Sequence, residues 1–156
     1  MTELQLFTFI HVAISLIGIG AGIVVLHGFL NGVARRFWNS LFLTTTGLTS
    51  VTGFFFPFHG MTPGIAIGIV SMLIFVPALI ASRKRWVKTY IVSATALEFF
   101  NVLVLIAQLF QKVPPLHRYA PKGNEPIVAL VQLLALLVFV GTGWFAVRRS
   151  QFALLR

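Results

Sequence analysis

Residues 44–58, TTTGLTSVTGFFFPF, place a hydroxyl-rich run directly before four phenylalanines and a proline, inside a segment apolar enough to cross a bilayer. Hydrocarbon offers no water to polar groups, so these hydroxyls must face other helices or bond to carbonyls of their own helix. Thr45, Thr49 and Thr52 recur at i, i+4 and i+7 and therefore form one threonine stripe along a helix. The stretch predicts a membrane helix whose polar side chains turn toward the interior of a bundle.

The composition of the whole chain is that of a membrane protein. Of its 156 residues, 58% are hydrophobic and 10% are charged, and the mean hydropathy is +0.95. Soluble domains carry roughly 25% charged residues. The net charge of +9 does not indicate nucleic-acid binding, because the basic residues stand in short clusters between apolar runs. The absence of cysteine excludes disulfides and thiolate metal sites.

Five apolar runs are each long enough for a membrane helix, which needs roughly 20 residues. We expect one all-α integral membrane domain over residues 1–156. Its spans are predicted at about 4–30, 38–58, 64–81, 89–111 and 127–147. Nine of the 12 Lys and Arg residues follow the first, third and last spans, so the positive-inside rule predicts an outer N-terminus and a cytoplasmic C-terminus. The rival topology has four spans and one segment lying in the interface.

The fourth span carries the polar residues that suggest a site within the membrane. Glu98 lies about nine residues into this span, near the bilayer midplane, and Asn101 and Gln108 share its side of the helix. An ionised carboxylate at that depth costs at least ~2.5–3.5 kcal/mol. Glu98 is therefore expected to be neutral or to exchange a proton. Two interpretations stay open: a functional polar site that includes the threonine stripe, or ordinary hydrogen bonds between packed helices.

The histidines are the candidate cofactor ligands. His11 and His59 lie toward the predicted outer side and would be used if the chain held a haem or a quinone. His11 and His27 are sixteen residues apart on nearly opposite helix faces, so they cannot share one haem. His117 and Glu125 add no H-x-x-x-H type spacing, and no metal site is predicted. No phosphate loop, G-x-S-x-G or His-Glu motif is present, so no catalytic residue is assigned.

Three functions from different classes are compatible with these features. Gly18 with Gly22, and Gly64 with Gly68, have the G-x-x-x-G spacing that lets helices approach closely. They favour a non-catalytic protein that packs in the bilayer as a homo-oligomer or as an accessory subunit of a membrane complex. The second function is a proton-linked carrier or permeation path centred on Glu98. The third is a membrane protein that binds haem or quinone.

Three runs of the sequence are distinctive: FLTTTGLTSVTGFFFPF at 42–58, FFNVLVLIAQLFQKVP at 99–114 and YAPKGNEP at 119–126. In these runs the chain resembles an uncharacterised family of small bacterial multi-spanning integral membrane proteins. The resemblance covers most of the chain, and TSVTGFFFPF is its most specific part. It implies a location in the bacterial cytoplasmic (inner) membrane and implies no activity, substrate or catalytic residue.

Overall fold

The chain folds into helices. The computed structural model describes residues 2–57 and 63–153, and no strand occurs within those two ranges. The helices are α1 (Glu3–Asn31), α2 (Arg36–Gly53), α3 (Pro63–Lys84), α4 (Val87–Lys112), α5 (Pro114–His117) and α6 (Pro126–Ala153). The expectation of an all-α bundle is confirmed.

Four of these helices, α1, α3, α4 and α6, are long and apolar enough to cross a membrane. The longest, α1, has 29 residues, which at ~1.5 Å per residue exceeds the ~30 Å hydrocarbon core of a bilayer. Its ends are set by local chemistry. Thr2 and Gln5 form a capping box at its start, and Gly32 follows its end with a φ of 68°. Glycine adopts this left-handed conformation without strain, which lets the chain leave the helix.

The second expected span differs most from the structure. We predicted it at about 38–58, but α2 covers Arg36–Gly53, and residues 54–56 form a turn. Seven of its 18 residues are Ser or Thr, and it also carries Arg36 and Asn39, so its composition is less apolar than that of the other long helices. The described part of the chain therefore holds four helices of membrane-spanning composition rather than five.

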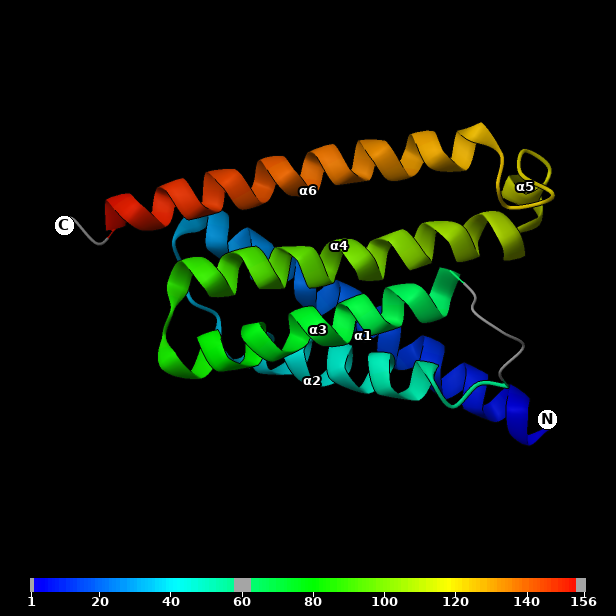
Figure 1. Ribbon diagram of the computed structural model, residues 1–156, viewed down its shortest axis with the longest axis horizontal. Helices are drawn as coiled ribbons and strands as arrows, with labels where there is room; N and C mark the ends of the chain where they lie inside the picture. Colours follow the sequence, from blue (N-terminus) through cyan, green and yellow to red (C-terminus); the bar gives the residue numbers. More distant parts are fainter. Residues whose placement is uncertain (1, 58–62, 154–156) are drawn as a thin grey trace.

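The helix α4 lies at the centre of the bundle (Figure 1). It contacts α1, α3 and α6, while α1 also packs along α2. The long helices alternate in direction, so the two ends of the chain lie at opposite ends of the bundle. In the most apolar stretch of each helix, 44% of the α4 residues are buried but only 11% of the α6 residues. Side chains of α4 are therefore the ones enclosed by protein, and α6 presents most of its surface outward.

Small residues allow the helices to approach α4 closely. Ala21, Ala78 and Ala94 are at most 1% exposed, and Phe42 and Leu97 fill the remaining space at 0% exposure. They belong to one cluster of buried side chains drawn from α1, α2, α3 and α4: Ala21, Val25, Phe42, Leu43, Ala78, Ala81, Tyr90, Ala94 and Leu97. This apolar core surrounds the polar side chains described below.

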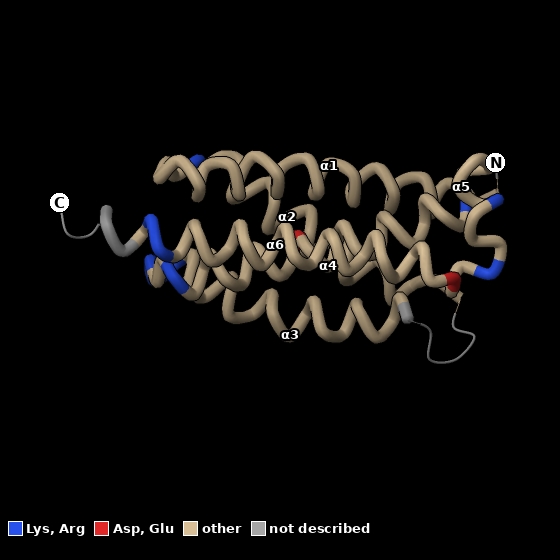
Figure 2. Tube along the Cα trace, turned by 90° about the horizontal axis from the view of Figure 1, so that it is seen from above, with Lys and Arg blue, Asp and Glu red and all other residues tan. Residues whose placement is uncertain are grey.

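Charged residues gather at the two ends of the bundle and leave its length largely apolar (Figure 2). The end at which α6 finishes, here the C-terminal end of the bundle, carries most of the described basic residues: Arg35, Arg36, Arg83, Lys84, Arg85, Lys88, Arg148 and Arg149. The opposite end carries Lys112, Arg118 and Lys122. This asymmetry follows the one that the sequence predicts for a membrane protein.

Candidate functional site: a polar column along α1, α2 and α4

Glu98 lies in the middle of α4 and is completely enclosed by protein. Its side chain is 0% exposed, although it is one of the most hydrophilic residues in the chain. The carboxyl group abuts Gly22 of α1, where a Cβ atom would overlap it. Neither carboxyl oxygen has a hydrogen-bond partner among the described residues. Glycine at position 22 is therefore what makes room for this carboxyl group.

One turn from Glu98, Asn101 connects α4 to α2. Asn101 of α4 donates a hydrogen bond from Nδ2 to Thr46 Oγ1 of α2 at 3.2 Å. Thr46 is 1% exposed, so this bond is in the interior. It ties α2 to α4 beside the carboxyl group, and polar bonds of this kind between membrane helices contribute roughly 0.6–2 kcal/mol.

The polar side chains continue from Asn101 along the interface of α1 and α2. Ser15 Oγ lies 3.3 Å from Thr49 Oγ1 and also donates to the carbonyl of His11 at 2.7 Å. One turn further on, His11 Nδ1 lies 2.8 Å from Thr52 Oγ1. Residues 11, 15, 18 and 22 of α1 recur at helical spacing on one face, so this face carries His11, Ser15, and the two glycines. We call this set of side chains the polar column: His11, Ser15, Thr46, Thr49, Thr52, Asn101 and Glu98.

The threonine stripe serves both the column and its own helix. Thr45 Oγ1 donates to the carbonyl of Leu41 at 2.7 Å, and Thr52 Oγ1 donates to that of Leu48 at 2.7 Å. Thr45 is buried against Gly18, because a Cβ there would lie 3.0 Å from Thr45 Oγ1. Both orientations expected for hydroxyls in a membrane helix, inward and toward the preceding turn, are therefore present.

Gln108 is not part of the column. The sequence placed it on the same side of the fourth span as Glu98 and Asn101, but its side chain is exposed. It lies ten residues from Glu98, near the end of α4 that leads into α5. The column therefore draws on Glu98 and Asn101 from α4, and not on Gln108.

The polar atoms of α4 continue past Glu98 toward the C-terminal end of the bundle. Thr95 Oγ1 and the Tyr90 hydroxyl are buried without a hydrogen-bond partner in the described residues, as is Asn39 Oδ1 of α2. The Tyr90 ring packs edge-on against Phe29 at 5.7 Å between centroids. Polar groups therefore occur on both sides of Glu98, bonded on one side and without protein partners on the other.

The expected cofactor ligands are only partly placed. His11 is half-buried, bonds to Thr52 and packs edge-on against Phe56 at 5.1 Å. His59 lies outside the described residues, so the pairing of His11 with His59 around a haem or quinone stays a prediction. Among residues 2–57 and 63–153, no group of three His, Asp or Glu side chains is placed to hold a metal ion.

Two members of the site are not among the residues predicted from the sequence. Ser15 Oγ lies 3.3 Å from Thr49 Oγ1. Gly22, whose spacing from Gly18 predicts close helix packing, has the carboxyl group of Glu98 as its partner. The signal that could have found both is the spacing 11, 15, 18 and 22, which places a histidine, a serine and two glycines on one face of α1.

Comparisons of this chain with protein-family models, curated proteins and solved structures find no match. The functional argument therefore depends on the geometry of the polar column.

Proposed function

We propose that this chain is a bacterial cytoplasmic-membrane protein that crosses the bilayer five times, with an outer N-terminus and a cytoplasmic C-terminus. The support for the orientation is the excess of basic residues at the C-terminal end of the bundle. The support for five crossings is the direction of the helices, since α1 and α3 run the same way and α2 connects them in the opposite direction (Figure 1).

The low apolar content of α2 is compatible with a crossing. Hydropathy scales treat each hydroxyl as though it faced lipid, but Thr45 and Thr52 bond to carbonyls of their own helix. Thr46 and Ser50 are buried, at 1% and 8% exposure. Hydroxyls that are bonded or enclosed do not have to be satisfied by lipid.

For this topology, we propose that the protein moves protons across the membrane, or couples proton movement to a solute, through Glu98. The observation that carries the proposal is the enclosure of its carboxyl group against Gly22 at 0% exposure. No Lys or Arg occurs in the described helices near this depth, so a carboxylate there would have no counter-charge. In the closed bundle the group is accordingly a neutral acid that holds a proton, and intramembrane acids are typical of proton relays.

The polar column would carry that proton from the outer side. Three separate hydrogen-bonded pairs follow one another toward Glu98: His11 with Thr52, Ser15 with Thr49, and Asn101 with Thr46. Hydroxyl and imidazole groups can each accept and donate a hydrogen bond. Water between these pairs and the carboxyl, which has no partner among the described residues, would complete the route.

Release of the proton toward the cytoplasmic side needs a water molecule at the carboxyl to accept it. For this step α1 and α4 would separate at the contact of Gly22 with Glu98, so that water enters from the side where Thr95 and Tyr90 lie and takes the proton. The carboxylate left behind would then be reprotonated through the polar column.

The experiment compares Glu98→Gln with wild-type protein in liposomes that contain a pH-sensitive dye. The amide has nearly the same shape but cannot exchange a proton, so we expect proton movement to fall to the level of protein-free liposomes while the yield of folded protein stays the same. Glu125→Gln is the matched control, because Glu125 is an acid outside the spans, and it should retain full activity. Unchanged proton movement in Glu98→Gln would refute the proposal.

A second candidate function, packing as a homo-oligomer or as an accessory subunit, is supported by the outer surface of α6. This helix is only 11% buried in its most apolar stretch, and Gly141 has no atom within 4 Å of where a Cβ would lie. Gly18 and Gly22, which first suggested association, are instead used inside the chain. Cross-linking in membranes through a cysteine at Gly141 tests this candidate, and monomers alone would count against it.

A further inference from the structure

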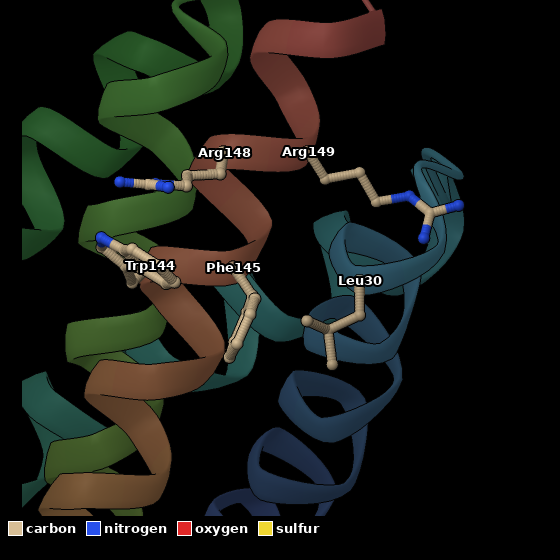
Figure 3. A pocket seen from close by; sticks show the side chains of 5 residues that line it. All are labelled: Leu30, Trp144, Phe145, Arg148 and Arg149. Carbon is tan, nitrogen blue, oxygen red and sulfur yellow. The ribbon is translucent and has the colours of Figure 1, made fainter.

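The ends of α1 and α6 line an open pocket at the C-terminal end of the bundle. It has a volume of about 520 Å³ and is lined by Leu30, Trp144, Phe145, Arg148 and Arg149 (Figure 3). This volume falls in the range of ~300–1,000 Å³ that is typical of small-molecule sites. The lining is apolar toward the middle of the bundle and basic at its end, which is the distribution of polarity in a phospholipid.

The two arginines of the pocket have no acidic partner among the described residues. The Arg148 guanidinium lies 4.0 Å from the centre of the Trp144 ring, in a cation–π contact. Arg149 extends toward α1, where its Nε lies 3.6 Å from the position of a Cβ on Gly32. In Figure 3 the two side chains leave α6 in opposite directions, one over Trp144 and one toward the end of α1. They therefore flank the pocket.

Within the described residues, no acidic side chain lies at this end of the bundle to pair with these arginines. The three acidic residues of the chain are Glu3, Glu98 and Glu125. Glu98 is enclosed in the middle of α4, while Glu3 starts α1 and Glu125 precedes α6, at the opposite end of the bundle. The phosphate group of an anionic lipid is the negative charge available at this depth, and guanidinium groups bind phosphate in bidentate geometry.

We propose that this pocket binds one anionic phospholipid from the leaflet at the C-terminal end of the bundle, with its phosphate at Arg149 and an acyl chain against Leu30 and Phe145. Leu30 and Phe145 are 36% and 61% exposed, so both present apolar surface to such a chain. Trp144 lies one turn before Arg148 in α6, and indole rings favour the membrane interface. The site depends on the chain lying in a membrane, but not on proton movement through Glu98.

The experiment measures lipid binding to detergent-solubilised protein by native mass spectrometry. The lipids are dioleoyl phosphatidylglycerol and dioleoyl phosphatidylcholine, which differ in net charge but share their acyl chains. We expect phosphatidylglycerol to bind at least about tenfold more tightly. Arg149→Gln should weaken its binding about fivefold, which corresponds to the ~1 kcal/mol that a basic residue contributes near an anionic membrane surface.

Two further variants distinguish binding in the pocket from general electrostatic attraction of anionic lipid to this end of the bundle. Lys84→Gln removes a charge at the same end of the bundle but outside the pocket, next to Trp86, and should leave the affinity within about twofold. Leu30→Trp fills the pocket without changing charge and should weaken binding about fivefold or more. Each variant is first checked for unchanged helix content and a single species in size-exclusion chromatography.

Three results would overturn the proposal. One is equal binding of the two lipids. Another is an equal loss of affinity in Lys84→Gln and Arg149→Gln, which would mean that only the overall charge of this end matters. The third is displacement of phosphatidylglycerol by millimolar inorganic phosphate, which would assign the arginines to a soluble anion.

Discussion

The contact between Gly22 and Glu98 predicts that a single methyl group at position 22 will disturb the interior of the bundle. In Gly22→Ala the new Cβ would overlap the Glu98 carboxyl group, and it would lie 2.9 Å from Oε1. Either the carboxyl swings to a new position or α1 moves away from α4. Because the Glu98 side chain is 0% exposed, both responses displace packed neighbours. Overpacking of this kind costs typically ~1–3 kcal/mol.

Gly20→Ala is the matched control on the same helix. No atom lies within 4 Å of the position of its Cβ, so the methyl group meets open space. Replacing a glycine inside a helix by alanine favours the helix by roughly 0.5–1 kcal/mol. We therefore expect Gly20→Ala to be neutral or stabilising and Gly22→Ala to be destabilising, as measured by equilibrium unfolding of the two proteins in mixed micelles.

The double variant Gly22→Ala with Glu98→Ala isolates the contact itself. If the cost of the methyl group comes from the carboxyl, removing the carboxyl should recover most of it, with a coupling free energy between ~0.5 and 3 kcal/mol. Equal stability of Gly20→Ala and Gly22→Ala would refute the reasoning, because it would mean that the Glu98 side chain has room to move.

The other predictions concern His11 and the outer loop. Thr52→Val removes the hydroxyl 2.8 Å from His11 Nδ1 and should lower the free energy of unfolding by ~0.5–1.5 kcal/mol. The control Thr44→Val, at an exposed position, should change it by less than ~0.5 kcal/mol. Equal effects of the two variants would contradict the placement of His11. The backbone N–H of Lys122 donates to the Glu125 carboxylate at 2.9 Å and holds the pKa of that carboxyl below its ordinary value of 4.5. Since the pKa is lowered in the folded loop, the carboxylate stabilises the loop at pH values above 4.5, and this contribution is lost as the pH falls through the lowered pKa. NMR titration of Glu125 should show a lower midpoint than in a free peptide of the same sequence. The same midpoint in both would rule out the bond.

The helical class and most helix positions could be predicted, because long apolar runs between basic clusters have few other structural solutions. The interior position of Glu98 follows from the same physics, since lipid does not solvate a carboxyl group. What the sequence could not provide is which helix touches which. Gln108 has nearly the same angular position around α4 as Asn101, yet Gln108 is exposed whereas Asn101 is half-buried and bonded to Thr46. The partners of Gly22 and Ser15 likewise depend on how α1 is placed against α4 and α2.

The hydrogen bonds that α2 makes with α1 and α4 bear on how the protein is assembled. Alone in lipid, α2 would expose Asn39 and several hydroxyls, and it would be the helix least able to stay inserted. It follows α1 directly along the chain, and the facing residues Ser15 and His11 are already synthesised when Thr49 and Thr52 emerge. If the chain crosses the bilayer five times as proposed, we expect the α1–α2 hairpin to insert as one unit, and removal of α1 to leave α2 without the partner that keeps it in the bilayer.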